Sequence, residues 1–160
     1  GPTGDDFLVL RGGTVFKGNQ VYNHAIATVA DDATETATTP VDTWVEVAGT
    51  LVQGVTTPTF TFAANAFTYI GPNQIVQTSL KAAVSLTKVL AGSQPYEVGI
   101  FVNDLLILNG MKTTVPEAEF VYVAAEVQRL LVTGDVIDMR VRSRSGTDSL
   151  TVANAQLIIG

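Results

Sequence analysis

The alternation of apolar and polar residues is clearest in the last thirty residues of the chain, where it predicts two β-strands. Residues 135–144 place apolar side chains on one face (Ile137, Met139 and Val141) and polar ones on the other (Asp138, Arg140, Arg142 and Arg144). Residues 149–159 resume the apolar pattern after a Ser-Gly-Thr-Asp turn. Because successive strand side chains point to opposite faces, this pattern predicts a sheet with one buried and one solvated surface.

Strand signals recur after Pro40, separated by Gly, Pro, Asn and Asp residues that favour turns. The further predicted strands are residues 43–49, 59–62, 67–70, 76–86, 97–102, 105–108 and 119–127. Residues 76–86 also fit a helical stripe, but their β-branched and hydroxyl side chains favour a strand. About eight main strands predict an all-β antiparallel sandwich of the jelly-roll type.

Residues 119–127 are apolar on both strand faces. Val121, Val123 and Ala125 alternate with Phe120 and Tyr122. We therefore expect this strand to be covered by the core on one side and by a partner subunit on the other.

Residues 1–40 differ from the rest of the chain. Short apolar segments at 7–10, 14–16 and 21–29 precede a polar, acidic, Thr-rich tract that ends at Pro40. This composition is typical of a linker, so we expect an N-terminal arm over residues 1–40 and a sandwich domain over residues 41–160. The opening Gly1-Pro2 is typical of a cleaved expression tag.

Composition narrows the function classes. The 160 residues suit one domain, and the absence of Cys excludes disulfides and thiolate catalysis. A net charge of −6 disfavours nucleic-acid binding, which depends on basic contacts to phosphates. Charged or amide residues interrupt every apolar run, so we expect no membrane insertion.

Three short motifs occur in order within residues 40–160. They are Phe-Thr-Tyr-Ile-Gly at 67–71, Ile-Phe-Val-Asn-Asp at 100–104, and Leu-Val-Thr-Gly-Asp-Val-Ile at 131–137. The first is similar to an aromatic-Gly strand end, the second to an I-F-x-N-G hairpin with Asp104 in place of Gly, and the third to an L-x-x-G-D-x-I turn. Together with the closing strand at 150–159, they resemble the C1q/TNF-like trimeric jelly-roll superfamily, especially its versions on bacteriophage fibres, tailspikes and capsid decorations.

This resemblance implies a homotrimer whose subunits pack along a three-fold axis through aromatic and aliphatic faces. It implies no conserved chemistry, because one fold hosts many functions. We accordingly expect no catalytic residue, no cofactor and no metal.

Arg140, Arg142 and Arg144 are the sharpest candidate site. Three guanidiniums about 7 Å apart on one strand face suit carboxylates, sulfates or phosphates. We favour ion pairs with acids on neighbouring strands or subunits instead, with Asp138, Asp148, Glu126 and Glu119 as the candidates. A third alternative places the row at the trimer interface.

Aromatic side chains are the second candidate. Trp44, Tyr69, Tyr96 and Tyr122 would stack on sugars, although core or interface packing is the default for strand aromatics. Tyr96 follows Gln94-Pro95 in an expected loop, so we expect it at a binding surface.

The remaining polar residues carry little chemistry. His24, the single His, would have to supply any His-based catalysis or zinc binding, and we expect it to make a structural contact. Asp31, Asp32 and Glu35 lack the spacing of a calcium loop.

The sequence thus predicts a non-enzymatic virion surface protein, either a phage fibre or tailspike terminal domain or a capsid decoration. Its expected partners are itself, other virion proteins and a host surface polysaccharide. A secreted glycan-binding lectin of the same fold and a glycan-cleaving enzyme or accessory module are the alternatives.

Overall fold

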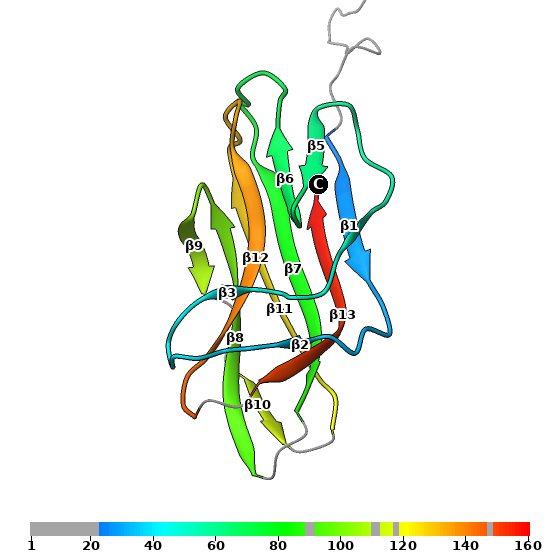
Figure 1. Cartoon of the computed structure of the whole chain (residues 1–160). Coiled ribbons are helices and arrows are strands. Elements are labelled where there is room, and N and C mark those ends of the chain that lie inside the picture. Colours follow the sequence, from blue (N-terminus) through cyan, green and yellow to red (C-terminus); the bar gives the residue numbers. More distant parts are fainter. Residues whose placement is uncertain (1–22, 89–91, 110–112, 117–118, 147–148) are drawn as a thin grey trace, which may run out of the picture.

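The structure, a computed structural model, describes residues 23–88, 92–109, 113–116, 119–146 and 149–160. These residues form two antiparallel β-sheets and contain no helix (Figure 1). Sheet A has the strand order β11-β7-β13-β1-β4, with β2 also paired to β13. Sheet B has the order β10-β8-β12-β6-β5, with β3 paired to β12 and β9 to β8. The predicted all-β sandwich is therefore confirmed.

Strand bounds agree with the sequence pattern to within about two residues for β7, β11, β12 and β13, whereas β8 begins four residues before the predicted strand at 97–102. Sheet A contains β1 (Ala25–Val29), β2 (Glu35–Thr36), β4 (Val52–Gln53), β7 (Thr78–Thr87), β11 (Val121–Arg129) and β13 (Leu150–Ile159). Sheet B contains β3 (Val45–Glu46), β5 (Phe60–Ala63), β6 (Ala66–Tyr69), β8 (Ser93–Val102), β9 (Leu105–Asn109), β10 (Thr113–Pro116) and β12 (Val136–Ser143).

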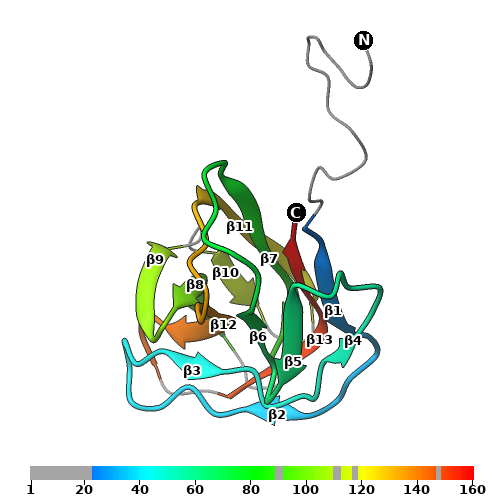
Figure 2. The ribbon, with the colours of Figure 1, turned by 90° about the horizontal axis from the view of Figure 1, so that it is seen from above.

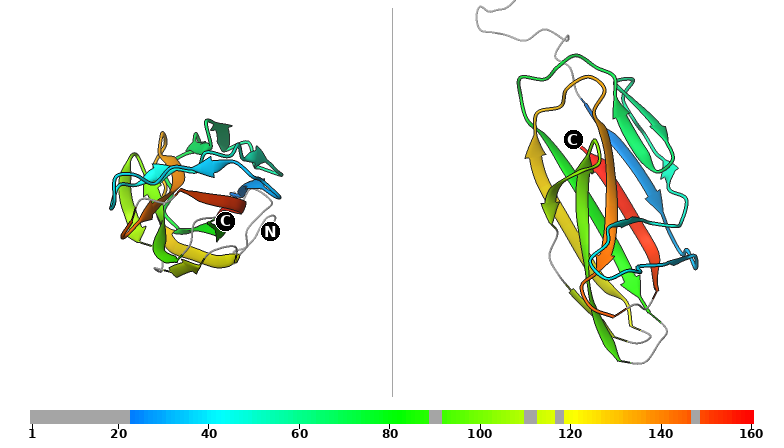
Figure 3. Two further views of the ribbon diagram at one scale, coloured as in Figure 1. Left: turned by 60° about the horizontal axis from the view of Figure 1, so that its bottom comes forward. Right: turned by 60° about the vertical axis from the view of Figure 1, so that its left-hand side comes forward.

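The core lies between the two sheets, which face each other along an elongated sandwich (Figures 2 and 3). In β12 the apolar positions of the alternation, Ile137, Met139 and Val141, are all buried. In β7 the positions Leu80 and Leu86 point to the same core, which settles the strand reading of this segment over the helical one. Burial of apolar surface between the sheets is the main stabilising contribution.

A β-bulge shifts the side-chain phase within β13. The pairing with β7 is irregular between Val152 and Asn154. Before the bulge Leu150 and Val152 point inward, and after it Leu157 and Ile159 do. An extra residue in one strand reverses which positions face the core, so the bulge keeps apolar residues buried along the whole strand.

The sandwich begins before Pro40, inside the segment that the sequence assigns to an arm. β1 pairs with β13 from Ala25↔Ile159 to Val29↔Ala155, and β4 flanks it on the other side. β2 pairs with the start of β13. Residues 1–22, with the apolar runs at 7–10 and 14–16, lie outside the described residues.

The three motifs of the sequence resemblance meet at one end of the sandwich. Asn103 of the second motif donates from Nδ2 to Asp135 Oδ1 of the third at 2.9 Å. Tyr69 of the first motif donates its backbone N–H to the Asp135 carbonyl at 2.8 Å. Asn103 and Asp104 have φ values of 54° and 65°, which Asn and Asp tolerate better than most residues. Asp104 therefore fits the tight turn between β8 and β9.

Candidate functional site

Arg140 and Arg142 of the predicted row lie on β12, on the outer face of sheet B, and Arg144 follows directly after the strand. Arg140 forms ion pairs with Asp104 in the β8–β9 turn and with Asp138 on its own strand, where Nε and Oδ2 are 2.8 Å apart. Its guanidinium carbon also lies 4.3 Å from the centroid of the Phe101 ring. Two carboxylates and one aromatic face therefore hold this side chain.

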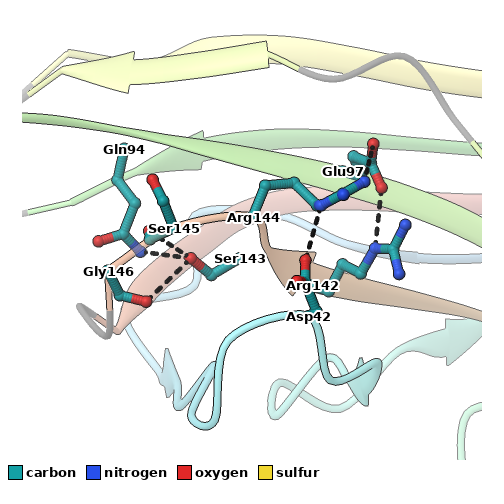
Figure 4. A network of polar contacts seen from close by, with 8 residues as sticks. All are labelled: Asp42, Gln94, Glu97, Arg142, Ser143, Arg144, Ser145 and Gly146. Carbon is teal, nitrogen blue, oxygen red and sulfur yellow. Dashed lines mark hydrogen bonds and ion pairs between the residues drawn. The ribbon is translucent and has the colours of Figure 1, made fainter.

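Arg142 and Arg144 share one buried carboxylate, Glu97 of β8 (Figure 4). The Arg142 Nε lies 2.9 Å from Glu97 Oε1, and the Arg144 Nη1 lies 3.1 Å from Oε2. Arg144 also binds Asp42 at 2.7 Å, and Arg142 stacks with its guanidinium carbon 4.5 Å from the Trp44 ring centroid.

Gly99 of β8 makes room for this layer of side chains. A Cβ at position 99 would come within 2.9 Å of both Trp44 and Leu106. Trp44 packs edge-on against Phe101, with 5.4 Å between ring centroids. Because Gly99 has no side chain, the segment before β3 can pack on the outer face of sheet B. The polar face of β12 is therefore half-buried rather than solvated.

Burial and ion pairing act in opposite directions on these groups. Loss of solvent raises the pKa of Asp138 above its ordinary value, and this outweighs the lowering caused by Arg140. For Arg140, burial lowers the pKa, but the hydrogen bonds that its guanidinium donates to Asp138 and Asp104 outweigh burial and raise the pKa above its ordinary value.

Each arginine in the row is therefore paired within its own chain. Of the acids that the sequence offered, Asp138 is a partner, whereas Glu126 accepts a hydrogen bond from Ser79 in sheet A. Asp148 lies outside the described residues. Glu97, Asp42 and Asp104 supply the remaining pairs. An external anion would have to displace these carboxylates, so a ligand-binding or intersubunit role for the row stays a prediction.

Tyr96 is fully buried in β8, and the expected loop at this position is a strand. Its Oη accepts a hydrogen bond from Gln94 Nε2 at 2.8 Å. The sequence suggested a loop because Pro95 cannot donate to a sheet. Pro95 lies beyond the last pair between β8 and β12, Tyr96↔Ser143, so it interrupts no bond between these two strands. The predicted position of Tyr96 at a binding surface is therefore wrong.

The other candidates scatter over the molecule. Tyr69 is buried, Trp44 is half-buried and Tyr122 is exposed. His24 donates its backbone N–H to Thr57 Oγ1. Within the described ranges, His, Cys, Asp and Glu side chains form no group of three able to hold a metal ion. No helix in this part of the chain has the length and apolarity that a membrane span requires.

The outer face of sheet A has a different character from that of sheet B, because small and uncharged side chains dominate it. The residues facing outward are Ile26, Thr28, Ala83, Ser85, Tyr122, Ala124, Asn154, Gln156 and Ile158. The two charged residues among its central strands, Lys81 and Glu126, lie opposite each other in the register of β7 and β11. This face is therefore nearly neutral.

A shallow hollow of about 320 Å³ lies on this face, lined by residues that include Thr28, Ala83, Tyr122 and Gln156. Tyr122, which lines the hollow, is 64% exposed, and Phe120, two residues before it, is 66% exposed. Sequence reasoning did not single out the central residues of this face. The one sequence feature that pointed to this face was that residues 119–127 are apolar on both faces of the predicted strand.

Comparisons with known proteins address the fold. No protein-family model and no curated protein sequence matches the chain. Murine APRIL at pH 5.0 is similar in structure, with a TM-score of 0.53 and 10% identity, covering 85% of this chain and 98% of that one. The globular domain of zebrafish complement 1qA has a TM-score of 0.51 and 12% identity, covering 86% and 94%.

Neither of these structures comes from a bacteriophage, so they give no support to the phage versions of the fold that the sequence motifs favoured. Identities this low show the fold alone. The two antiparallel sheets and these similarities together show that the chain has the jelly-roll sandwich fold of TNF/C1q-like domains.

Proposed function

We propose that the chain is a non-enzymatic, self-assembling module, a homotrimeric jelly roll whose sheet A packs against neighbouring copies. The observation that carries this proposal is the outer face of sheet A, which is nearly neutral and carries the exposed Tyr122, with the exposed Phe120 just before β11. Interface cores are depleted in charge and enriched in aromatic residues, and this face combines both features.

The outer faces of the two sheets differ in how far they are available for contact with another copy. The outer face of sheet B is already covered by Trp44 and by the paired arginines. In the part of the chain that the structure describes, no segment covers the outer face of sheet A in this way, and its alanines and serines permit close approach of another backbone. A contact between this face and the β11 edge of the next copy is head-to-tail, and such contacts close into a ring around a three-fold axis.

Mass measurement in solution tests the assembly. We expect the wild-type protein to sediment as a trimer at micromolar concentration, and Gln156→Arg to sediment as a monomer. Gln156 is exposed in the single subunit, so the substitution leaves the fold intact, but the proposed contact with the next copy would have to remove the Arg charge from water.

Thr61→Arg is the matched control, because Thr61 is exposed on β5 of the opposite sheet. It should remain trimeric. A wild-type monomer at these concentrations, or equal effects of the two substitutions, would contradict the proposed interface.

The setting we propose is the virion surface, where the trimer contacts other virion proteins and a host polysaccharide. This part rests on the sequence motifs. It is tested by mass spectrometry of purified particles from the source and by a binding screen on bacterial surface polysaccharides. A screen without hits, together with absence from every particle, would contradict it.

A further inference from the structure

Exposed aliphatic side chains gather at the end of the sandwich where β6 leads into β7. Ile75 is 93% exposed, Val76 72% and Ile70 51%. Val132, 49% exposed, lies in the neighbouring connection between β11 and β12. Single exposed aliphatic residues are ordinary, but a contiguous group of them marks an interaction surface.

The loop that carries Ile75 and Val76 is held in place by its polar groups. Tyr69 Oη donates to the Pro72 carbonyl at 2.6 Å, and Gln74 Oε1 accepts from the Leu131 N–H at 3.0 Å. Asn73 Oδ1 accepts from the Thr133 N–H at 2.9 Å. The amides point inward and the aliphatic side chains outward, which is the reverse of a typical surface loop.

This loop forms one wall of a hollow of about 500 Å³, and the chain ends form another. Asn23, the first described residue, lines the hollow together with Gly160. Gly160 donates its N–H to Ser79 at 2.8 Å, and a Cβ at position 160 would meet the Asn23 carbonyl. The chain preceding Asn23 therefore starts from the hollow itself.

That preceding chain contains the apolar residues to fill it. Residues 14–16 read Thr-Val-Phe and are followed by Gly18-Asn19, a pair that favours a turn. Asn23 follows Phe16 by seven positions in the chain, and an extended chain of seven residue steps reaches about 23–25 Å. We infer that Val15 and Phe16 dock in this hollow of their own subunit, against Ile75 and Val76. The inference holds whether or not the protein is a trimer.

Disulfide trapping gives a direct test, because the chain contains no Cys. We expect Phe16→Cys with Ile75→Cys in the full chain to form an intrachain disulfide under mild oxidation. Phe16→Cys with Thr114→Cys should not, since the exposed Thr114 lies on β10 at the opposite end of the sandwich (Figure 1). A disulfide between subunits would overturn docking within one chain, and equal yields for the two pairs would overturn the site.

Limited proteolysis gives an independent readout. Ile75→Asp should speed chymotryptic cleavage after Phe16 roughly tenfold. The cleavage rate follows the population of undocked chain, and loss of the free energy from burying one Ile side chain raises that population by about this factor. Leu105→Asp, at another exposed aliphatic position, should leave the cleavage rate unchanged. Unchanged cleavage in Ile75→Asp would overturn the docking.

Discussion

Asp138 shows how a polar position of a simple alternation acquires its own chemistry. The sequence places it on the polar face of β12, yet it is only 5% exposed, and the Arg140 guanidinium binds it there. Arg140 compensates the buried charge only in part, so the pKa of Asp138 remains raised. Glu46 and Asp104 contribute to the rise.

A pH dependence of stability follows for this residue. The folded protein holds the Asp138 proton more tightly than the unfolded chain, whose pKa is near 3.8. The stabilising contribution is therefore complete below that pKa and is lost as the pH rises through the raised one. The unfolding free energy of the wild type relative to Asp138→Asn should fall as the pH rises above 3.8.

Urea denaturation followed by Trp44 fluorescence at a series of pH values measures this difference. Asp104→Asn, which removes the exposed carboxylate bound to Arg140, serves as the comparison. A difference that grows with rising pH would show that the ion pair with Arg140 outweighs burial.

At the scale of elements, the long strands were predictable from the sequence, whereas the start of β8 and the arrangement of the loop at residues 70–77 were not. Alternation located β7, β12 and β13, because a half-buried strand must alternate. The same reasoning took Pro95 as the sign of a loop, and with it misplaced Tyr96, because a single sequence does not show that Pro95 lies opposite Thr114 of β10 with its carbonyl accepting from the Arg144 N–H. The loop of residues 70–77 likewise carried no sign that its amides would point inward.

Gln74 is the residue whose removal should loosen that loop. In Gln74→Ala the N–H of the buried Leu131 loses its acceptor, which should cost about 1–3 kcal/mol of unfolding free energy. Hydrogen exchange at the Leu131 amide should accelerate. Gln77→Ala is the matched control, since Gln77 is an exposed residue of the same loop. Equal protection of Leu131 in both variants would refute the anchoring role.

At the scale of the whole molecule, the three short motifs were useful because they converge. Their residues Tyr69, Asn103 and Asp135 bond to one another at one end of the sandwich. They specify turns that close a jelly roll, and turn chemistry of this kind is compatible with many functions. This explains why the motifs predicted the fold correctly while the similar structures leave the virion setting without support.

Self-association should also affect the melting temperature of the whole molecule. If folded copies bind one another, the melting temperature must rise with protein concentration. For a chain of this size we expect a rise of roughly 2–4 °C for each tenfold increase. Scanning calorimetry of the wild type and of Gln156→Arg measures it. The variant should melt at a constant temperature, and a constant wild-type value would argue against the trimer.

The sequence by itself determined the all-β class, the main strands and the ordered turns, because these depend on neighbours along the chain. Only the tertiary structure decided where the polar groups went. In the folded chain Glu97 pairs with two arginines, Trp44 packs over Gly99, and Tyr96 is buried. Among the described residues, the tertiary structure also left the outer face of sheet A without a covering segment. These outcomes depend on which segments meet across the sandwich, and residue spacing along one strand carries no information about that.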